Sequence, residues 1–127
     1  MNDEISILLT IPGIGYFSAL LIYAEVGDIN RFPNSKKLCS YAGLVPTVRQ
    51  SGNKIIRGRI TKEGNKLLRW VLVQCAHMAV RKDERLRQFY ERIKAKKGHQ
   101  KAIVATARKL LTVIYACWKN KTPYGEG

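Results

Sequence analysis

One serine stands among five cationic side chains, and this combination suits phosphate-ester chemistry. Ser51 precedes Gly52, and the cations of residues 49–62 are Arg49, Lys54, Arg57, Arg59 and Lys62. A serine that attacks phosphorus needs cations to bind the non-bridging oxygens and stabilise the developing charge. Arginine suits this role because its guanidinium binds phosphate through two hydrogen bonds. Ser51 is therefore a candidate nucleophile, and the cations are candidate phosphate ligands.

A simpler interpretation of the same stretch needs no catalysis. Ser-Gly is a common turn pair, so turn chemistry explains Ser51 equally well. Basic segments also bind a nucleic-acid backbone without reacting with it. No His or carboxylate lies close to Ser51 in the sequence. A base that activates the serine would therefore have to come from elsewhere.

A second candidate site is the glycine-containing turn at residues 9–15 (LTIPGIG), which is followed by an apolar run. This pattern is typical of a helix-hairpin-helix. Gly13 and Gly15 allow the backbone to approach a phosphate closely, and the free N–H groups of the next helix face the anion. The alternative is a tight turn between two helices that binds no ligand.

The spacing of apolar residues predicts an all-α fold that positions these sites. Expected helices span residues 3–10, 16–26, about 34–43, 62–81, 84–95 and 100–118. Thr61 is expected to cap the helix at 62–81, which has a cationic face of Lys62, Lys66 and Arg69. Its apolar stripe, expected in the core, is Leu67, Leu68, Val71, Leu72, Cys75, Met78 and Ala79.

Two segments lie outside this helical pattern. Residues 44–60 contain Pro46, Gly52 and Gly58 without a helical period, and we expect an irregular basic loop or small hairpin there. The chain after Lys119 is expected to fray. The fold is thus a helix-hairpin-helix at 1–30, the serine loop at 44–60 and a small bundle of long helices at 61–118, in one domain.

The charge is concentrated in the later part of the chain. The 127 residues have a formal net charge of +14. Residues 1–48 contribute −1, whereas residues 49–127 contribute +15. Such a charge indicates a polyanionic partner, DNA or RNA, and argues against a metabolic enzyme for small neutral substrates.

The cysteines and the apolar start of the chain bear on the compartment. Cys39, Cys75 and Cys117 are far apart and odd in number, which favours free thiols in the cytoplasm over disulfides or a structural metal site. Residues 5–24 are uncharged, but Pro12, Gly13 and Gly15 interrupt them. We therefore predict no membrane span.

Five motifs in order resemble the C-terminal domain of insertion sequence 110 family transposases, which are bridge-RNA-guided DNA recombinases. The resemblance covers residues 7–118. The motifs are IPGIG, ALLIYAEVGDINRF, KKLCSYAGLVP, RQSGNKIIRGRITKEGNKLLRWVLVQCA and FYERIKAKKGHQKAIVATARKLL.

The resemblance implies a role in DNA transposition by strand cleavage and exchange. Ser51, in the QSG segment, matches the family's nucleophile, which forms a covalent phosphoserine with DNA. A structured guide RNA selects the bases, the active site is composite, and family members act as homo-oligomers. An N-terminal RuvC-like domain supplies acidic metal-binding residues for Mg²⁺ in the family. That domain is not in this sequence, so we expect a truncated chain with no cofactor of its own that is inactive when isolated.

Two alternatives remain open. The chain can be a non-enzymatic helix-hairpin-helix module, or a transposase relic, that binds DNA or RNA through its basic side chains. A ribosomal-type RNA-binding protein also fits the charge, but it gives no reason for the ordered QSG and GRITKEGN motifs.

Overall fold

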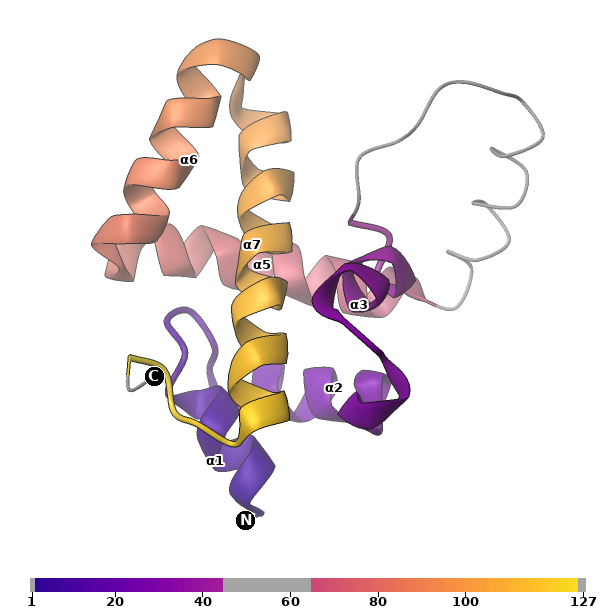
Figure 1. The fold of residues 1–127 in the computed structure, drawn as a ribbon. Coiled ribbons are helices and arrows are strands. Elements are labelled where there is room, and N and C mark those ends of the chain that lie inside the picture. Colours follow the sequence, from indigo (N-terminus) through magenta and orange to yellow (C-terminus); the bar gives the residue numbers. More distant parts are fainter. Residues whose placement is uncertain (1, 45–64, 126–127) are drawn as a thin grey trace, which may run out of the picture.

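The computed structural model describes residues 2–44 and 65–125, and all regular structure in these two ranges is helical. This confirms the predicted all-α class for that part of the chain. Figure 1 shows the elements in chain order. They are α1 (Asp3–Leu9), α2 (Tyr16–Val26), the short 3-10 helix η1 (Ile29–Arg31), α3 (Ser35–Tyr41), α5 (Lys66–Lys82), α6 (Glu84–Lys97) and α7 (His99–Asn120).

Side-chain caps mark where several helices begin. The Oδ1 of Asn2 accepts a hydrogen bond of 2.7 Å from the amide of Ile5 at the start of α1. Asn34 caps α3 in the same way, through the amide of Lys37. Asp83 lies between α5 and α6 and accepts a bond from the amide of Leu86. These caps satisfy amides that lack a partner within the helix.

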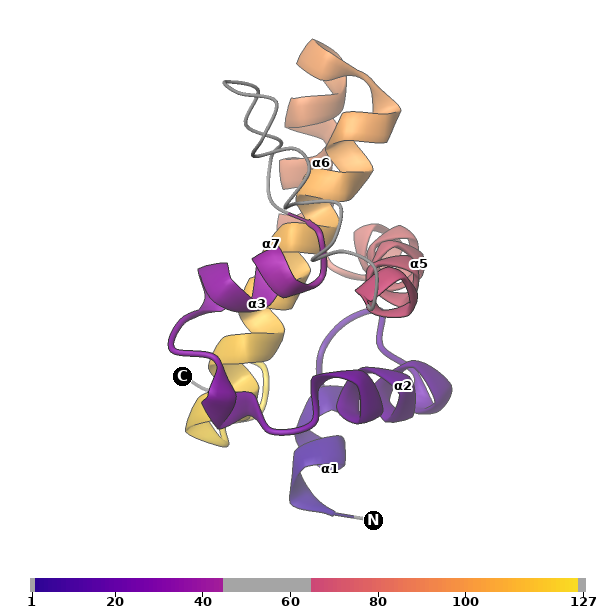
Figure 2. The same ribbon diagram turned by 90° about the vertical axis from the view of Figure 1, so that its right-hand side faces the viewer.

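Helix α7 is the centre of the fold and packs against α1, α3, α5 and α6. Figure 2 shows α2 and α5 next to each other on one side of α7. Near its end, the buried Trp118 stacks on Tyr23 with ring centroids 5.7 Å apart. Its indole N–H also donates a hydrogen bond of 2.7 Å to Glu4. The last helix thus holds the hairpin against the bundle.

Two sequence predictions about packing are wrong. Leu67 and Met78, placed in the core stripe, are 44% and 41% exposed. They lie at one margin of the buried stripe of α5, which consists of Leu68, Val71, Leu72, Cys75, Ala76 and Ala79. The chain after Lys119 is not frayed as far as residue 125, because Tyr124 bonds to Thr10 through its amide and to Asp83 through its hydroxyl.

Other predictions concern residues outside the two described ranges. Thr61 and the irregular segment expected at 44–60, apart from Leu44, lie outside the described residues. None of the described helices combines the length and hydrophobicity that a membrane crossing requires.

Candidate nucleic-acid interface

The hairpin turn packs its first glycine directly against α5. Gly13 has a φ of +87°, and a Cβ there would lie 2.5 Å from the carbonyl oxygen of Cys75 and 2.8 Å from the amide nitrogen of Ala79. Only glycine fits this conformation and this approach without strain. The geometry therefore gives Gly13 a packing role, and its contact with phosphate stays a prediction.

The second glycine of the hairpin is open to solvent. Gly15 is the N-cap of α2, makes no side-chain cap and has no atom within 4 Å of a Cβ built on it. Tyr16 and Phe17 follow it and are 58% and 69% exposed. In the sequence these rings belong to the apolar run that follows the turn. Their position directly after the glycine cap, where the first turn projects outward, was the signal that could have found them.

The end of α3 is built as a glycine-terminated cap. Gly43 adopts a φ of +72°, and its amide donates to the carbonyl of Ser40. The amide of Leu44 donates to the carbonyl of Cys39, and Leu44 is fully buried. This is a Schellman motif, in which a left-handed residue ends the helix and an apolar residue follows. It fixes the direction in which the chain leaves α3.

Two arginines hold the next main-chain carbonyls. The Nη1 of Arg69, on α5, donates a hydrogen bond of 2.8 Å to the carbonyl of Gly43. The Nη1 of Arg108, on α7, donates one of 3.0 Å to the carbonyl of Leu44. Residues from three helices therefore meet where the chain enters the Ser51 segment, which we define as residues 45–64.

The structure places only some of the predicted site residues. Ser51 and its cations Arg49, Lys54, Arg57, Arg59 and Lys62 lie outside the described residues. Lys66 begins α5 and is exposed, as a phosphate ligand must be. Arg69 is half-buried and its guanidinium bonds to Gly43, which the sequence analysis did not foresee. Gly13 thus packs on the C-terminal half of α5, at Cys75 and Ala79, whereas Arg69 lies in the first turn of that helix, so the two are separate features.

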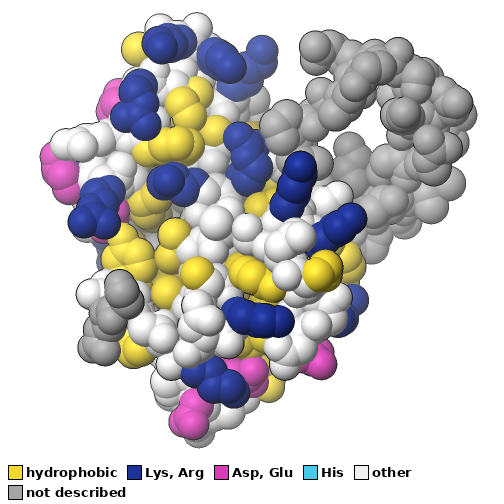
Figure 3. All heavy atoms as spheres, viewed as in Figure 1, with side chains coloured by type: hydrophobic (Ala, Val, Ile, Leu, Met, Phe, Trp, Pro, Cys, Tyr) yellow, Lys and Arg dark blue, Asp and Glu magenta, His cyan; other side chains and the backbone are white. Residues whose placement is uncertain are grey.

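Most cations of the described helices are not neutralised by carboxylates. Across residues 2–44 and 65–125 the only ion pair is Arg87 with Glu84, at 2.6 Å. In Figure 3, Lys and Arg side chains lie from the top of the molecule to its lower part, and Asp and Glu lie at the left edge and the bottom. Among the described residues most of these cations have no carboxylate partner, and a polyanion neutralises a surface of that kind.

The three cysteines are free and buried. Burial raises the pKa of each thiol above its ordinary value of 9.0. At neutral pH they are therefore uncharged and unsuited to act as nucleophiles. Within the two described ranges, no three His, Cys, Asp or Glu side chains gather as a metal site would require.

Comparison with known proteins finds one matching family and several similar proteins. The family described as "Transposase IS116/IS110/IS902 family" matches residues 5–91. The chain is 35% identical over 99% of its length to the transposase for insertion sequence element IS1111A of Coxiella burnetii. It is 33% identical over 93% of its length to an IS110 protein of Streptomyces coelicolor, and 35% identical over 99% to the pilin gene-inverting protein of Moraxella bovis.

These matches cover 36%, 29% and 40% of the respective relatives, so the chain spans about a third of their length. The family match includes the hairpin, the end of α3, the Ser51 segment and all of α5. The resemblance seen in the ordered motifs is confirmed, and the chain belongs to the IS116/IS110/IS902 family of transposases.

Proposed function

We propose that this chain is the part of an insertion-sequence transposase that carries the nucleophilic serine, Ser51, which attacks a DNA phosphodiester during strand cleavage and exchange. The attack joins the serine oxygen to phosphorus as a phosphoserine and releases a deoxyribose hydroxyl, which takes up a proton. The activating base and the metal-binding carboxylates come from another domain or protomer. A guide RNA and self-association belong to the same proposal.

The observation that carries the proposal is the pair of arginine contacts at the end of α3. A nucleophile must be delivered to its target from a defined position. Arg69 and Arg108 fix the carbonyls of Gly43 and Leu44 at the start of the Ser51 segment. Because a residue spans at most about 3.6 Å, the Cα of Ser51 lies within about 25 Å of Leu44. The chain that carries Ser51 thus leaves the described fold from a point that two arginines hold.

The hairpin supplies a second contact with the phosphate backbone in this proposal. Gly15 is exposed at the beginning of α2, and no side chain caps the first amides there. Those amides and the positive end of the helix dipole favour an anion. No Lys or Arg lies in residues 1–30, so the contact depends on the backbone. Gly13 serves this arrangement indirectly by holding the turn on α5.

A chimera tests the nucleophile directly. The matching third of the Coxiella burnetii relative is replaced by this chain, and the protein is incubated with RNA transcribed from the relative's element and with DNA that carries the ends of that element. We expect a covalent protein–DNA adduct that Ser51→Ala abolishes. Ser6→Ala, an exposed serine on α1, should leave the adduct yield unchanged.

Three outcomes bear on the assignment. Adducts that persist in the Ser51→Ala chimera would show that another group attacks DNA. Equal loss in the Ser51→Ala and Ser6→Ala chimeras would show that the assay reports folding rather than chemistry. If the unsubstituted chimera binds the DNA without forming an adduct, the non-enzymatic binding module becomes the better interpretation.

A further inference from the structure

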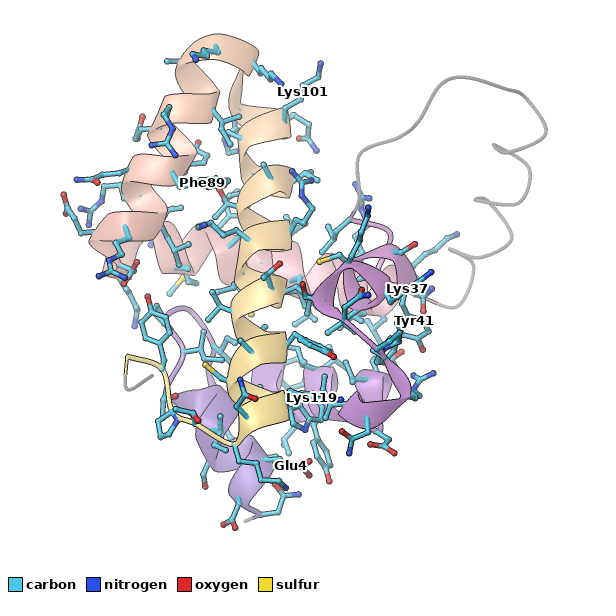
Figure 4. All side chains as sticks on the ribbon, in the orientation of Figure 1. Glu4, Lys37, Tyr41, Phe89, Lys101 and Lys119 are labelled. Carbon is cyan, nitrogen blue, oxygen red and sulfur yellow. The ribbon has the colours of Figure 1, made fainter. Side chains whose placement is uncertain are left out.

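A groove of about 900 Å³ crosses α7 between α3 and α6, outside the residues assigned to the serine and the hairpin. In Figure 4, Phe89 on α6 and Lys37 on α3 lie on either side of α7. Both residues line the groove, and Ala105 of α7 contributes a small side chain between them. The groove is open, so it suits an extended chain better than an enclosed small molecule.

The charge in the groove has one sign. Four of its lining residues are cations: Lys36, Lys37, Arg108 and Lys109. No carboxylate lines it, and none of these four forms an ion pair with any described residue. Three hydroxyl side chains, Ser35, Ser40 and Thr112, complete the polar part of the lining. Cations with hydroxyl donors are the side chains that contact phosphate and sugar in nucleic-acid complexes.

An aromatic ring lies among these cations. Phe89 is half-buried, and the Nζ of Lys109 lies 4.9 Å from the centroid of its ring. The guanidinium of Arg92 lies 5.7 Å from the same centroid. A basic groove with an aromatic ring is the arrangement that binds unpaired nucleotides, because the backbone follows the charge and a base stacks on the ring. A duplex keeps its base faces stacked on one another and offers phosphates, sugars and base edges instead.

We propose that this groove binds single-stranded DNA during the proposed strand cleavage. Arg108 lines the groove and also holds the carbonyl of Leu44, so the groove adjoins the point where the chain enters the Ser51 segment. The choice of DNA over RNA rests on the proposed function, whereas the binding of an unpaired strand rests on the groove alone.

Equilibrium binding by the 127-residue chain tests the groove. The probe is a fluorescent oligothymidine of about ten nucleotides, within the range that such single-strand sites cover. The test variant is Lys37→Gln with Lys109→Gln. The control is Lys119→Gln with Lys121→Gln, which removes the same charge from exposed positions at the far end of α7. We expect the groove pair to lose about tenfold in affinity and the salt slope to fall by about 0.7 for each lysine. The control should change little.

Substitutions of Phe89 separate the contribution of base stacking to binding from the contribution of charge. Phe89→Leu keeps an apolar side chain and should weaken binding of the oligothymidine about tenfold, while duplex binding changes little. Phe89→Trp should retain single-strand affinity. Circular dichroism confirms that each variant is folded. The groove proposal would be overturned if the two lysine pairs lost the same affinity for the oligothymidine, or if Phe89→Leu lost none.

Two further experiments distinguish DNA from RNA as the bound strand and separate the groove proposal from the proposed function. An oligouridine that binds more tightly than the oligothymidine would overturn the DNA assignment. All binding is repeated with Ser51→Ala, which forms no adduct, so a failed nucleophile leaves the groove result unaffected. Conversely, the chimera can be made with Lys37→Gln and Lys109→Gln. If it forms adducts at an unchanged rate and binds single-stranded DNA with unchanged affinity, the groove proposal fails and the nucleophile proposal stands.

Discussion

The guanidinium of Arg108 donates a hydrogen bond of 3.0 Å to the carbonyl of Leu44, which is 64 residues earlier in the chain. Arg69 makes the equivalent bond, 2.8 Å long, to the preceding residue, Gly43. Both carbonyls follow the end of α3, where no further helical turn supplies donors. The two arginines therefore act on the backbone of the protein itself, as Arg31 does at the carbonyl of Val26.

Replacing Arg108 by lysine should uncouple charge from geometry. Lysine keeps the positive charge but lacks the planar fork, so the bond to Leu44 is weakened or lost. We expect Arg108→Lys to lower the free energy of unfolding by about 1 kcal/mol, measured by urea denaturation. Arg81→Lys, at an exposed position of α5, is the control and should change it little. An unchanged urea midpoint in Arg108→Lys would contradict the structural role.

Substitution of Lys66 should affect DNA binding, whereas substitution of Arg69 should affect stability, although both residues are predicted to bind phosphate. Lys66 is exposed, so Lys66→Gln should leave stability unchanged and reduce the salt slope of DNA binding by about 0.9. Arg69→Gln should lower the free energy of unfolding by about 1 kcal/mol, because it leaves the carbonyl of Gly43 without its donor. Denaturation and salt titrations on the same samples measure both. Identical behaviour of the two variants would argue against the assignment of Arg69 to Gly43.

Gly13 should be far less tolerant of substitution than Gly15. Gly13→Ala forces a Cβ to within 2.5 Å of the carbonyl oxygen of Cys75 at a φ of +87°. Strain and overpacking together should cost roughly 2–5 kcal/mol. Gly15→Ala is the matched control, because its backbone is extended and its Cβ position is open. Thermal denaturation of the two variants should therefore differ by well over 5 °C. Similar melting temperatures would disprove the close packing of the hairpin on α5.

The sequence predicts the helices well and the contacts between distant segments less well. Helical spacing and caps such as Asn34 depend on near neighbours in the chain, so pattern alone locates α1, α2, α3, α6 and α7. The bond from Arg69 to Gly43 and the packing of Gly13 on Ala79 join distant segments, and no local pattern encodes them. Leu67 and Met78 were misplaced because periodicity gives a helix face but not the width of its contact.

The groove shows a different limit of sequence reasoning. Lys36, Phe89 and Lys109 are separated by long stretches of chain, and only the crossing of α3 and α6 over α7 brings them together. Composition predicted a basic surface and a polyanionic partner. It did not single out Phe89, an apolar residue within the helix expected at 84–95. The ring is instead half-buried beside cations.

An acidic cap at Gly15 should weaken DNA binding without damaging the fold. Gly15→Asp supplies a side-chain acceptor for the first amides of α2, which stabilises the helix by a few tenths of a kcal/mol. The same carboxylate occupies the proposed phosphate position and repels a phosphate there. We expect DNA affinity to fall severalfold while the melting temperature stays level or rises. Gly15→Ser, a neutral cap, is the control. Unchanged affinity in Gly15→Asp would remove the hairpin from the interface.

The buried thiols should make native alkylation slow and ordered. The pKa of Cys75 is raised by burial, with an opposing contribution from a hydrogen bond to Ser18, and burial also raises the pKa of Cys117. With iodoacetamide at pH 8, Cys117 at 9% exposure should react before Cys39 at 3% and Cys75 at 1%, and all three more slowly than in urea. Peptide mass spectrometry gives the order.

The sign of the pH effect on stability follows from the same shifts. The folded state keeps the thiol protons at a pH where the unfolded chain has lost them, so the unfolded state binds fewer protons. The contribution of Cys75 is therefore complete below about pH 9 and is lost as the pH rises through the raised value. Denaturant titrations of the chain and of Cys75→Ala from pH 8 to about 10.5 measure it. Their difference in unfolding free energy should shrink with pH, and a difference that widens would place the thiolate, rather than the thiol, in the folded protein.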